Sequence, residues 1–172
     1  MNMTQENVLD KIWLKKYPKN VPAEVVLDPQ HSLKDVVRES VQKFVDNDAY
    51  TNMGKTISFN QLDKLAESFA AYLQNSLGIK KGDAVAIMMP NLLQYPVALI
   101  AIHRIGAVVV NVNPLYTPRE LEHQLNDSNA KAIVIVENFA NTLEQVLDNT
   151  NVKHVVLTKM GDLLGFKGHL VN

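Results

Sequence analysis

The stretch from Ala84 to Val112, AVAIMMPNLLQYPVALIAIHRIGAVVVNV, determines the fold class that we predict for this chain. It holds an apolar run, Ala84 to Met89, a helical segment, Leu92 to Ile105, that stops at Gly106, and a second apolar run, Ala107 to Val112. Neither run alternates with polar residues, so both predict strands that are buried on both faces. This order of elements indicates parallel strands joined by a right-handed crossover.

The same rhythm continues after Val112. Residues Thr117 to Glu120 form a capping box with Pro118 at the first helical position, and they predict a helix to about Asn126. A strand, a helix and a strand are then expected at Ala132 to Val136, Phe139 to Leu147 and His154 to Thr158. The chain is therefore predicted to be an α/β protein, with a mostly parallel sheet and helices on both of its faces.

Smaller elements are expected before the sheet. Ser32 is placed to cap a helix whose apolar residues recur at helical spacing, namely Leu33, Val36, Val37, Val41 and Phe44. Residues Ala49 to Ser58 predict a small antiparallel hairpin that turns at Gly54. A second capping box, Ser58 to Gln61, opens a long helix that is expected to stop at Gly78.

These elements divide the chain into three predicted parts. Residues 1–31 contain three prolines and little periodicity, which is typical of an extended N-terminal arm. Residues 32–160 form the α/β subdomain. Residues 161–172 follow the last strand and are expected to form a flexible end.

Composition excludes several classes of function. The 172 residues carry a net charge of −1, which argues against nucleic acid as a partner. The chain has no cysteine, so disulfides and thiolate metal sites are excluded and a cytoplasmic location is expected. The first residues lack the pattern of a secretory signal. The uncharged run Ala84 to Ile102 is interrupted by Pro90 and Pro96, so we interpret it as strand, turn and helix, and not as a membrane span.

No phosphate-binding loop is recognisable. The turn after the first parallel strand, Met89 to Asn91, contains proline and no glycine, so a dehydrogenase-type dinucleotide fingerprint is missing where it belongs. The segment that is most similar to a glycine-rich phosphate-binding loop is Gly161 to Gly168, which we interpret as part of the flexible end.

No catalytic group of residues can be assembled from the sequence either. The five histidines show no metal-ligand spacing, and they are His31, His103, His123, His154 and His169. We interpret His103 as a cation at a helix C-terminus and His123 as an exposed helix residue. No serine has the surroundings of a hydrolase nucleophile. We therefore predict no catalytic, cofactor-binding or metal-binding residue within this chain.

Two segments resemble core motifs of the adenylate-forming superfamily. Ile57 to Leu62 is similar to the first motif, with Gln61 where glutamate is usual, and Ile102 to Pro114 is similar to the second, with Ile105 where alanine is usual. The run Pro90 to Leu125 resembles bacterial long-chain fatty acyl-CoA ligases still more closely. This resemblance extends over nearly the whole chain, from Ile12 to Gly161.

The resemblance implies an N-terminal fragment of such a ligase, cut off before its ATP-binding loop. The full enzyme would use ATP, Mg²⁺ and coenzyme A to convert a fatty acid to acyl-adenylate and then acyl-CoA, whereas the fragment alone would be inactive and bind none of the three tightly. A stand-alone, non-catalytic binding module of the same fold is the alternative. At the carboxyl ends of the strands, Asn111, Asn113 and Tyr116 lie where a ligand would sit, although we favour turn stabilisation for all three.

The N-terminal arm carries a further expectation. It combines apolar, aromatic and basic residues in a way that suits a membrane interface: Val8, Lys11, Ile12, Trp13, Leu14, Lys15 and Lys16. Peripheral contact with the inner membrane is one interpretation, because the substrate of such a ligase is poorly soluble. The other is that Trp13 packs on a partner subunit in a homodimer.

Overall fold

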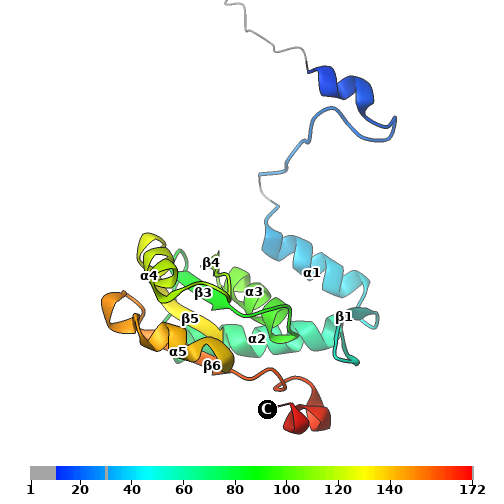
Figure 1. Ribbon diagram of the computed structural model, residues 1–172. Helices are drawn as coiled ribbons and strands as arrows, with labels where there is room; N and C mark the ends of the chain where they lie inside the picture. The colour runs from blue at the N-terminus through cyan, green and yellow to red at the C-terminus, as the bar shows by residue number, and fades with distance from the viewer. Residues whose placement is uncertain (1–10, 30, 172) are drawn as a thin grey trace, which may run out of the picture. The chain divides into compact units, whose positions relative to one another are not determined.

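The computed structural model describes residues 11–29 and 31–171, and the chain divides into two compact units, residues 1–32 and 33–172 (Figure 1). The described residues of the first unit include a short 3-10 helix, η1 (Ile12–Lys16), none of whose residues is buried. Val8 lies outside the described residues. The boundaries that we predicted at residues 31 and 160 remain predictions.

The second unit is built on four parallel strands. They are β3 (Ala84–Met88), β4 (Val108–Asn111), β5 (Ala130–Val136) and β6 (His154–Thr158), and they are ordered β4-β3-β5-β6. All three strand pairings are parallel, so the predicted α/β fold with a parallel sheet is confirmed.

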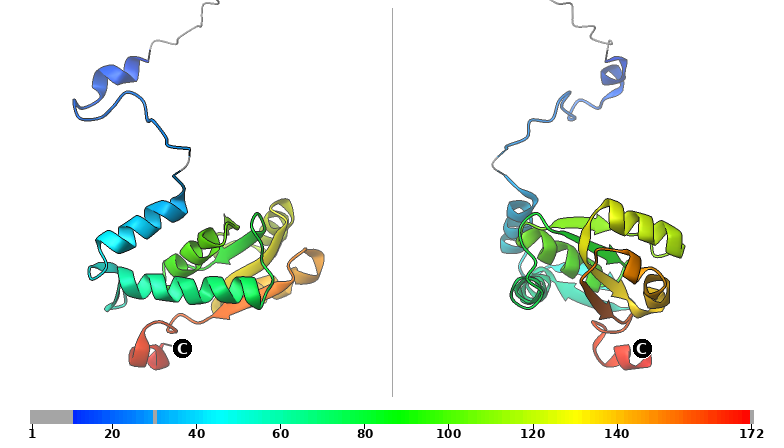
Figure 2. Two further views of the ribbon diagram at one scale, coloured as in Figure 1. Left: turned by 180° about the vertical axis from the view of Figure 1, so that it is seen from behind. Right: turned by 90° about the vertical axis from the view of Figure 1, so that its left-hand side faces the viewer.

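Helices cover both faces of this sheet. α2 (Phe59–Asn75) and α3 (Gln94–Arg104) lie on one face, and α4 (Pro118–Asp127) and α5 (Ala140–Glu144) lie on the other (Figure 2). Alternate residues of β3 enter two separate cores: Val85 and Ile87 pack under α2 and α3, whereas Ala86 and Met88 pack under α4 and α5. The two middle strands are therefore buried on both faces, as predicted.

The predicted burial of the outer strands is wrong. We predicted that Ala107 to Val112 form a buried strand, but Val108 in β4 is 50% exposed. Leu157 in β6 is 58% exposed. Both strands are at an edge of the four-stranded sheet, so each has a neighbour on one side only, and apolar composition alone does not reveal this position.

The helix predicted from Phe139 to Leu147 is also wrong in its extent. The segment forms a 3-10 turn, η2 (Glu137–Phe139), the five-residue α5, and a second 3-10 turn, η3 (Leu147–Asn149). Asn141 and Thr142 are weak helix formers. Two apolar anchors, Leu143 and Val146, hold the segment on the sheet and fix its position without a longer helix.

The predicted hairpin and the two predicted capping boxes are confirmed, whereas the cap at Ser32 stays a prediction. The hairpin pairs β1 (Asp48–Asn52) with β2 (Lys55–Ser58). Both of its loop residues have positive φ, 48° at Met53 and 74° at Gly54, which is the conformation of a type I′ turn. Ser58 and Thr117 accept hydrogen bonds from the backbone amides of Gln61 and Glu120, and both capping boxes are complete.

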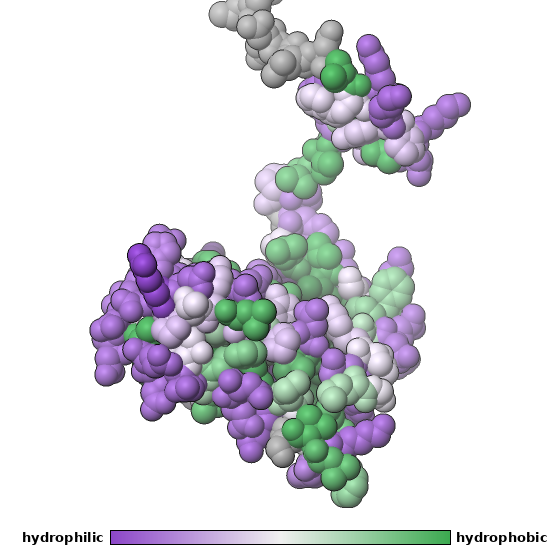
Figure 3. Space-filling view, viewed as in Figure 1, coloured by the Kyte–Doolittle hydropathy of each residue, from purple (hydrophilic) through white to green (hydrophobic). Residues whose placement is uncertain are grey.

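The first helix of this unit, α1 (Leu33–Lys43), starts where predicted. None of its residues is buried, although its apolar residues recur at helical spacing. Val37 packs against the core, whereas Leu33 is 64% exposed and Val36 45% exposed. Apolar side chains are visible on the surface over α1 and over the C-terminal segment (Figure 3). The C-terminal segment forms a short 3-10 helix, η4 (Gly165–Leu170), and its predicted flexibility stays a prediction.

The uncharged run Ala84 to Ile102 forms β3, a turn and most of α3, as the prolines predicted. Among residues 11–29 and 31–171, the structure has no helix whose length and apolar character would let it cross a membrane.

Asp83 holds the amino edge of the sheet together. Its carboxylate accepts a hydrogen bond from the Lys80 amide at 2.9 Å and one from the Lys131 ammonium at 2.6 Å. Both hydrogen bonds lower the pKa of Asp83 below its usual range, and the one from Lys131 has the larger effect. Because Lys131 belongs to β5, the carboxylate links the turn before β3 to the neighbouring strand.

We expect Asp83→Asn to reduce the free energy of unfolding at pH 7 by about 1 kcal/mol, a small value because Lys131 is half exposed to screening solvent. The lowered pKa means that the wild-type carboxylate stabilises the fold above its unfolded pKa of about 4 and loses this effect as the pH falls through the lower, folded pKa. Urea unfolding at a series of pH values therefore measures a difference that shrinks toward low pH. The exposed Asp127→Asn is the matched control, and an equal pH trend in both variants would contradict the assignment.

Candidate functional site at the carboxyl edge of the sheet

The carboxyl edge of the sheet is the place where this topology positions a site. The chain leaves β3 toward α3 on one face and leaves β5 toward α5 on the other, so the connections diverge between these two adjacent strands. Open α/β sheets bind ligands at such a divergence. The loops at this edge begin at Met89, Val112, Glu137 and Lys159.

The end of β4 and the loop after it contain the three residues that the sequence singled out. The Asn111 side-chain oxygen accepts a hydrogen bond from the Tyr95 hydroxyl at 2.9 Å. The Asn113 side-chain oxygen accepts one from the Leu115 amide at 3.0 Å, as in an Asx turn. Tyr116 is half-buried against the core under α4. These contacts have the form of turn stabilisation, and an approach of the three residues to a ligand stays a prediction.

Gln94 is a residue of this edge that the sequence reasoning missed. It is the first residue of α3, and its side-chain amide donates to the Lys159 carbonyl at 2.6 Å and to the Thr158 hydroxyl at 3.3 Å. It therefore joins the start of α3 to the end of β6, which are 64 residues apart in the sequence. The one feature of the sequence that could have indicated this role is the position of Gln94 directly after the turn that follows β3.

Beside Gln94 lies an apolar groove of about 420 Å³. Its walls come from α2, from the first turns of α3, and from β5 and β6. The apolar and aromatic residues that line it are Leu65, Phe69, Tyr72, Val97, Ala98, Val134, Val156, Leu157 and Leu163. The groove has room and surface for a hydrophobic group next to the carboxyl edge.

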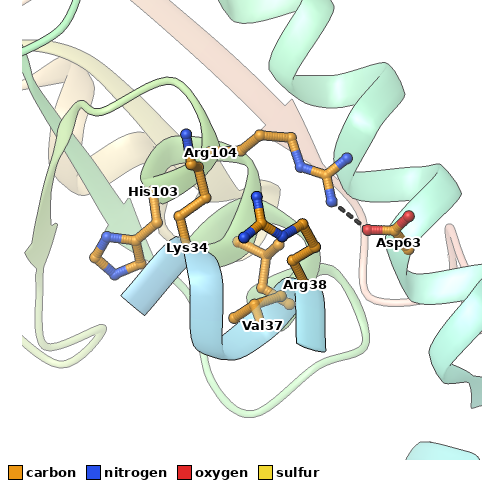
Figure 4. Close-up of a pocket in the computed structure, with 7 residues that line it drawn as sticks. Lys34, Val37, Arg38, Asp63, His103 and Arg104 are labelled. Atoms are coloured by element: carbon orange, nitrogen blue, oxygen red, sulfur yellow. Dashed lines mark hydrogen bonds and ion pairs between the residues drawn. The ribbon is translucent and has the colours of Figure 1, made fainter. Parts of the chain in front are cut away.

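A second hollow, of about 310 Å³, lies between α1, α2 and α3 (Figure 4). We call it the basic pocket, because four of the side chains that line it are basic: Lys34, Arg38, His103 and Arg104. Figure 4 shows Arg104 turned to Asp63, with which it forms an ion pair. His103 is in the last turn of α3, as expected, whereas its place in a pocket was not predicted. His123 is on the exposed side of α4.

The loops at the carboxyl edge do not form a glycine-rich cradle of the kind that binds the phosphates of a nucleotide. The turn at Pro90 lacks one amide and has no glycine. The segment from Gly161 to Gly168 is folded on itself, since a β-carbon on Gly168 would lie 2.0 Å from the Gly161 carbonyl oxygen. No group of three histidine or carboxylate ligands for a metal occurs within residues 11–29 and 31–171.

Comparison with known proteins identifies the family of this chain. The family model described as AMP-binding enzyme matches residues 37–168. A long-chain-fatty-acid–CoA ligase of Escherichia coli O157:H7 is 60% identical over 95% of this chain. The ligases of the same name from Haemophilus influenzae and Bacillus subtilis are 54% and 32% identical over 95% and 94% of the chain. The chain spans 29% of the length of the Escherichia coli relative and 28% of that from Bacillus subtilis.

Solved structures agree on the fold. A long-chain-fatty-acid–CoA ligase from Archaeoglobus fulgidus superposes with a TM-score of 0.70 at 27% identity, over 77% of this chain and 28% of that one. An anthranilate–CoA ligase in complex with anthranoyl-AMP has a TM-score of 0.73 at 21% identity, over 77% of this chain and 26% of that one, which is a likeness of fold.

Proposed function

Because this chain belongs to the AMP-binding enzyme family, we propose that it is the N-terminal part of a long-chain-fatty-acid–CoA ligase. The observation that carries the proposal is the 60% identity to a ligase of that name over 95% of this chain. Identity at this level extends through the sheet, the caps and the carboxyl-edge loops, so it supports a common architecture for the whole subdomain.

The proposed reaction has two steps. A fatty acid carboxylate attacks the α-phosphorus of ATP, which gives acyl-adenylate and releases pyrophosphate. The thiol of coenzyme A then attacks the acyl carbon, which gives acyl-CoA and releases AMP. We propose that Mg²⁺ accompanies ATP, as charge neutralisation of a polyphosphate requires.

We propose that these 172 residues give the carboxyl edge of the sheet its shape and that they contribute no catalytic residue. Gln94 fixes the start of α3 to the end of β6, and Asn111 fixes the end of β4 to Tyr95 in α3. The apolar groove beside Gln94 offers a surface that suits a hydrocarbon chain. Since the loops at the carboxyl edge form no glycine-rich phosphate cradle, we propose that this chain alone binds neither ATP nor coenzyme A tightly.

We expect the 172-residue chain to show no exchange of labelled pyrophosphate into ATP when it is supplied with palmitate and Mg²⁺. The reason is that exchange requires the α-phosphate to be bound and activated, and the described residues offer no group for this. A chain that extends the same sequence to the length of its relatives is the positive control. Exchange by the 172 residues alone would contradict the proposal, and saturable ligand binding without exchange by the extended chain would favour a non-catalytic binding module.

We also propose that the N-terminal arm touches the surface of the inner membrane. Its helix η1 exposes Ile12 at 65% and Trp13 at 50%, and Lys15 and Lys16 are in its last turn. Lys11 is held by Glu24 at 2.6 Å. An exposed tryptophan beside lysines suits the headgroup region of an anionic bilayer, and a membrane location would bring such a ligase to its poorly soluble substrate.

Co-sedimentation with vesicles of phosphatidylglycerol measures this contact. We expect the chain to pellet with the vesicles and the double variant Trp13→Ala/Lys15→Ala to stay in the supernatant, because the variant loses both the aromatic anchor and one of the attracting charges. Tyr17→Ala/Lys19→Ala, on the same arm, is a control for general changes of charge. If the chain stays in the supernatant and instead forms a dimer that Trp13→Ala disrupts, then the arm is a subunit contact.

A further inference from the structure

The basic pocket brings together basic side chains from helices that are distant in sequence, with the carboxylate of Asp63 among them. Lys34 and Arg38 project from α1, and His103 and Arg104 come from the end of α3 (Figure 4). Val37 and Ile100 add an apolar wall. The carboxylates that offset these charges are Asp63, which pairs with Arg104, and Asp35, which pairs with Arg38 at 2.9 Å. Three permanent cations therefore face two carboxylates.

The pairings leave donor groups available in the pocket. A guanidinium has five N–H groups, and Arg104 contacts Asp63 through one of its terminal nitrogens. The Arg38–Asp35 pair is on the surface, with the Arg38 side chain 60% exposed, and pairs of this kind contribute little to stability. Within residues 11–29 and 31–171, Lys34 has neither an ion pair nor a hydrogen bond through its ammonium.

A solvated helix face is the simpler explanation for Lys34 and Arg38, which are one turn apart on α1. It does not account for their convergence with the end of a second helix. Like charges one helical turn apart are mildly destabilising, and Arg104 places a third cation at the same hollow. A bound anion would remove this cost, and a planar guanidinium beside an ammonium is the combination that proteins use for phosphate.

We propose that the basic pocket binds a phosphate group, with Lys34 and Arg38 as its main donors and Arg104 held in place by Asp63. The exposed apolar residues Leu33 and Val36 are on the same helix as Lys34 and Arg38, and the phosphate belongs either to a lipid headgroup or to a soluble phosphate monoester. The site is separate from the carboxyl edge of the sheet, since Lys34 and His103 lie outside the loops that form that edge.

The test is a titration of the 172-residue chain with inorganic phosphate at low ionic strength, followed by the backbone amide signals in nuclear magnetic resonance. We expect saturable shifts confined to α1 and the last turn of α3. The double variant Lys34→Gln/Arg38→Gln should bind about tenfold more weakly, since it lacks two charge-assisted donors. Lys43→Gln is the matched control, because it removes the same charge from the same helix about two and a half turns away.

Two results would overturn the proposal. One is the absence of saturable shifts in α1 and α3, or equal shifts with chloride at the same ionic strength. The other is an unchanged half-saturation point in Lys34→Gln/Arg38→Gln when the amide spectrum shows that the variant is folded.

Two further arms identify the source of the phosphate. If glycerol 3-phosphate shifts the same amides and the vesicle binding is the same in Lys34→Gln/Arg38→Gln as in the unchanged chain, then the ligand is soluble. If the double variant loses binding to phosphatidylglycerol vesicles while Trp13→Ala retains it, then the ligand is a lipid headgroup. Both results support the pocket as a phosphate site.

Discussion

The second unit depends on the parallel pairing of β3 with β5. These are the strands whose buried side chains enter both cores, and every residue from Ala84 to Met88 is buried. A tight hairpin cannot join two parallel strands, so the connection between them crosses over the sheet. The helices of such connections cover both faces of the sheet and shield it from water. The helices α2 to α5 do this, and α1 packs on the outside of α2 and α3.

The same pairing explains where a site forms. Because the chain turns to opposite faces after β3 and after β5, the carboxyl ends of these strands are left open between diverging connections. The polar contacts at this edge, from Gln94 to Lys159 and from Tyr95 to Asn111, connect the start of α3 to the segment after β6 and to the end of β4. They give the edge a defined shape, and in the proposed ligase this shape supports residues that supply the chemistry.

Much of the fold could be predicted from the sequence, because its signals are local. The capping boxes at Ser58 and Thr117 and the stop at Gly106 each depend on a few adjacent residues. The exposure of Val108 could not be predicted, since it depends on which strand is at the edge. For the same reason the basic pocket was missed: Lys34, Asp63 and Arg104 belong to three helices, and only their packing brings them together. The absence of a phosphate loop from the turn at Pro90 was a local signal, and it was read from the sequence.

Hydrogen exchange of the native chain, followed amide by amide, measures the central claim that the β3–β5 pair supports the rest. The slowest amides should be those of Val85 to Ile87 and Ile133 to Ile135, with exchange that requires global unfolding. The amides of the edge strands β4 and β6 should exchange faster, through local opening. Equal protection across all four strands, or slower exchange in β6 than in β3, would contradict the account.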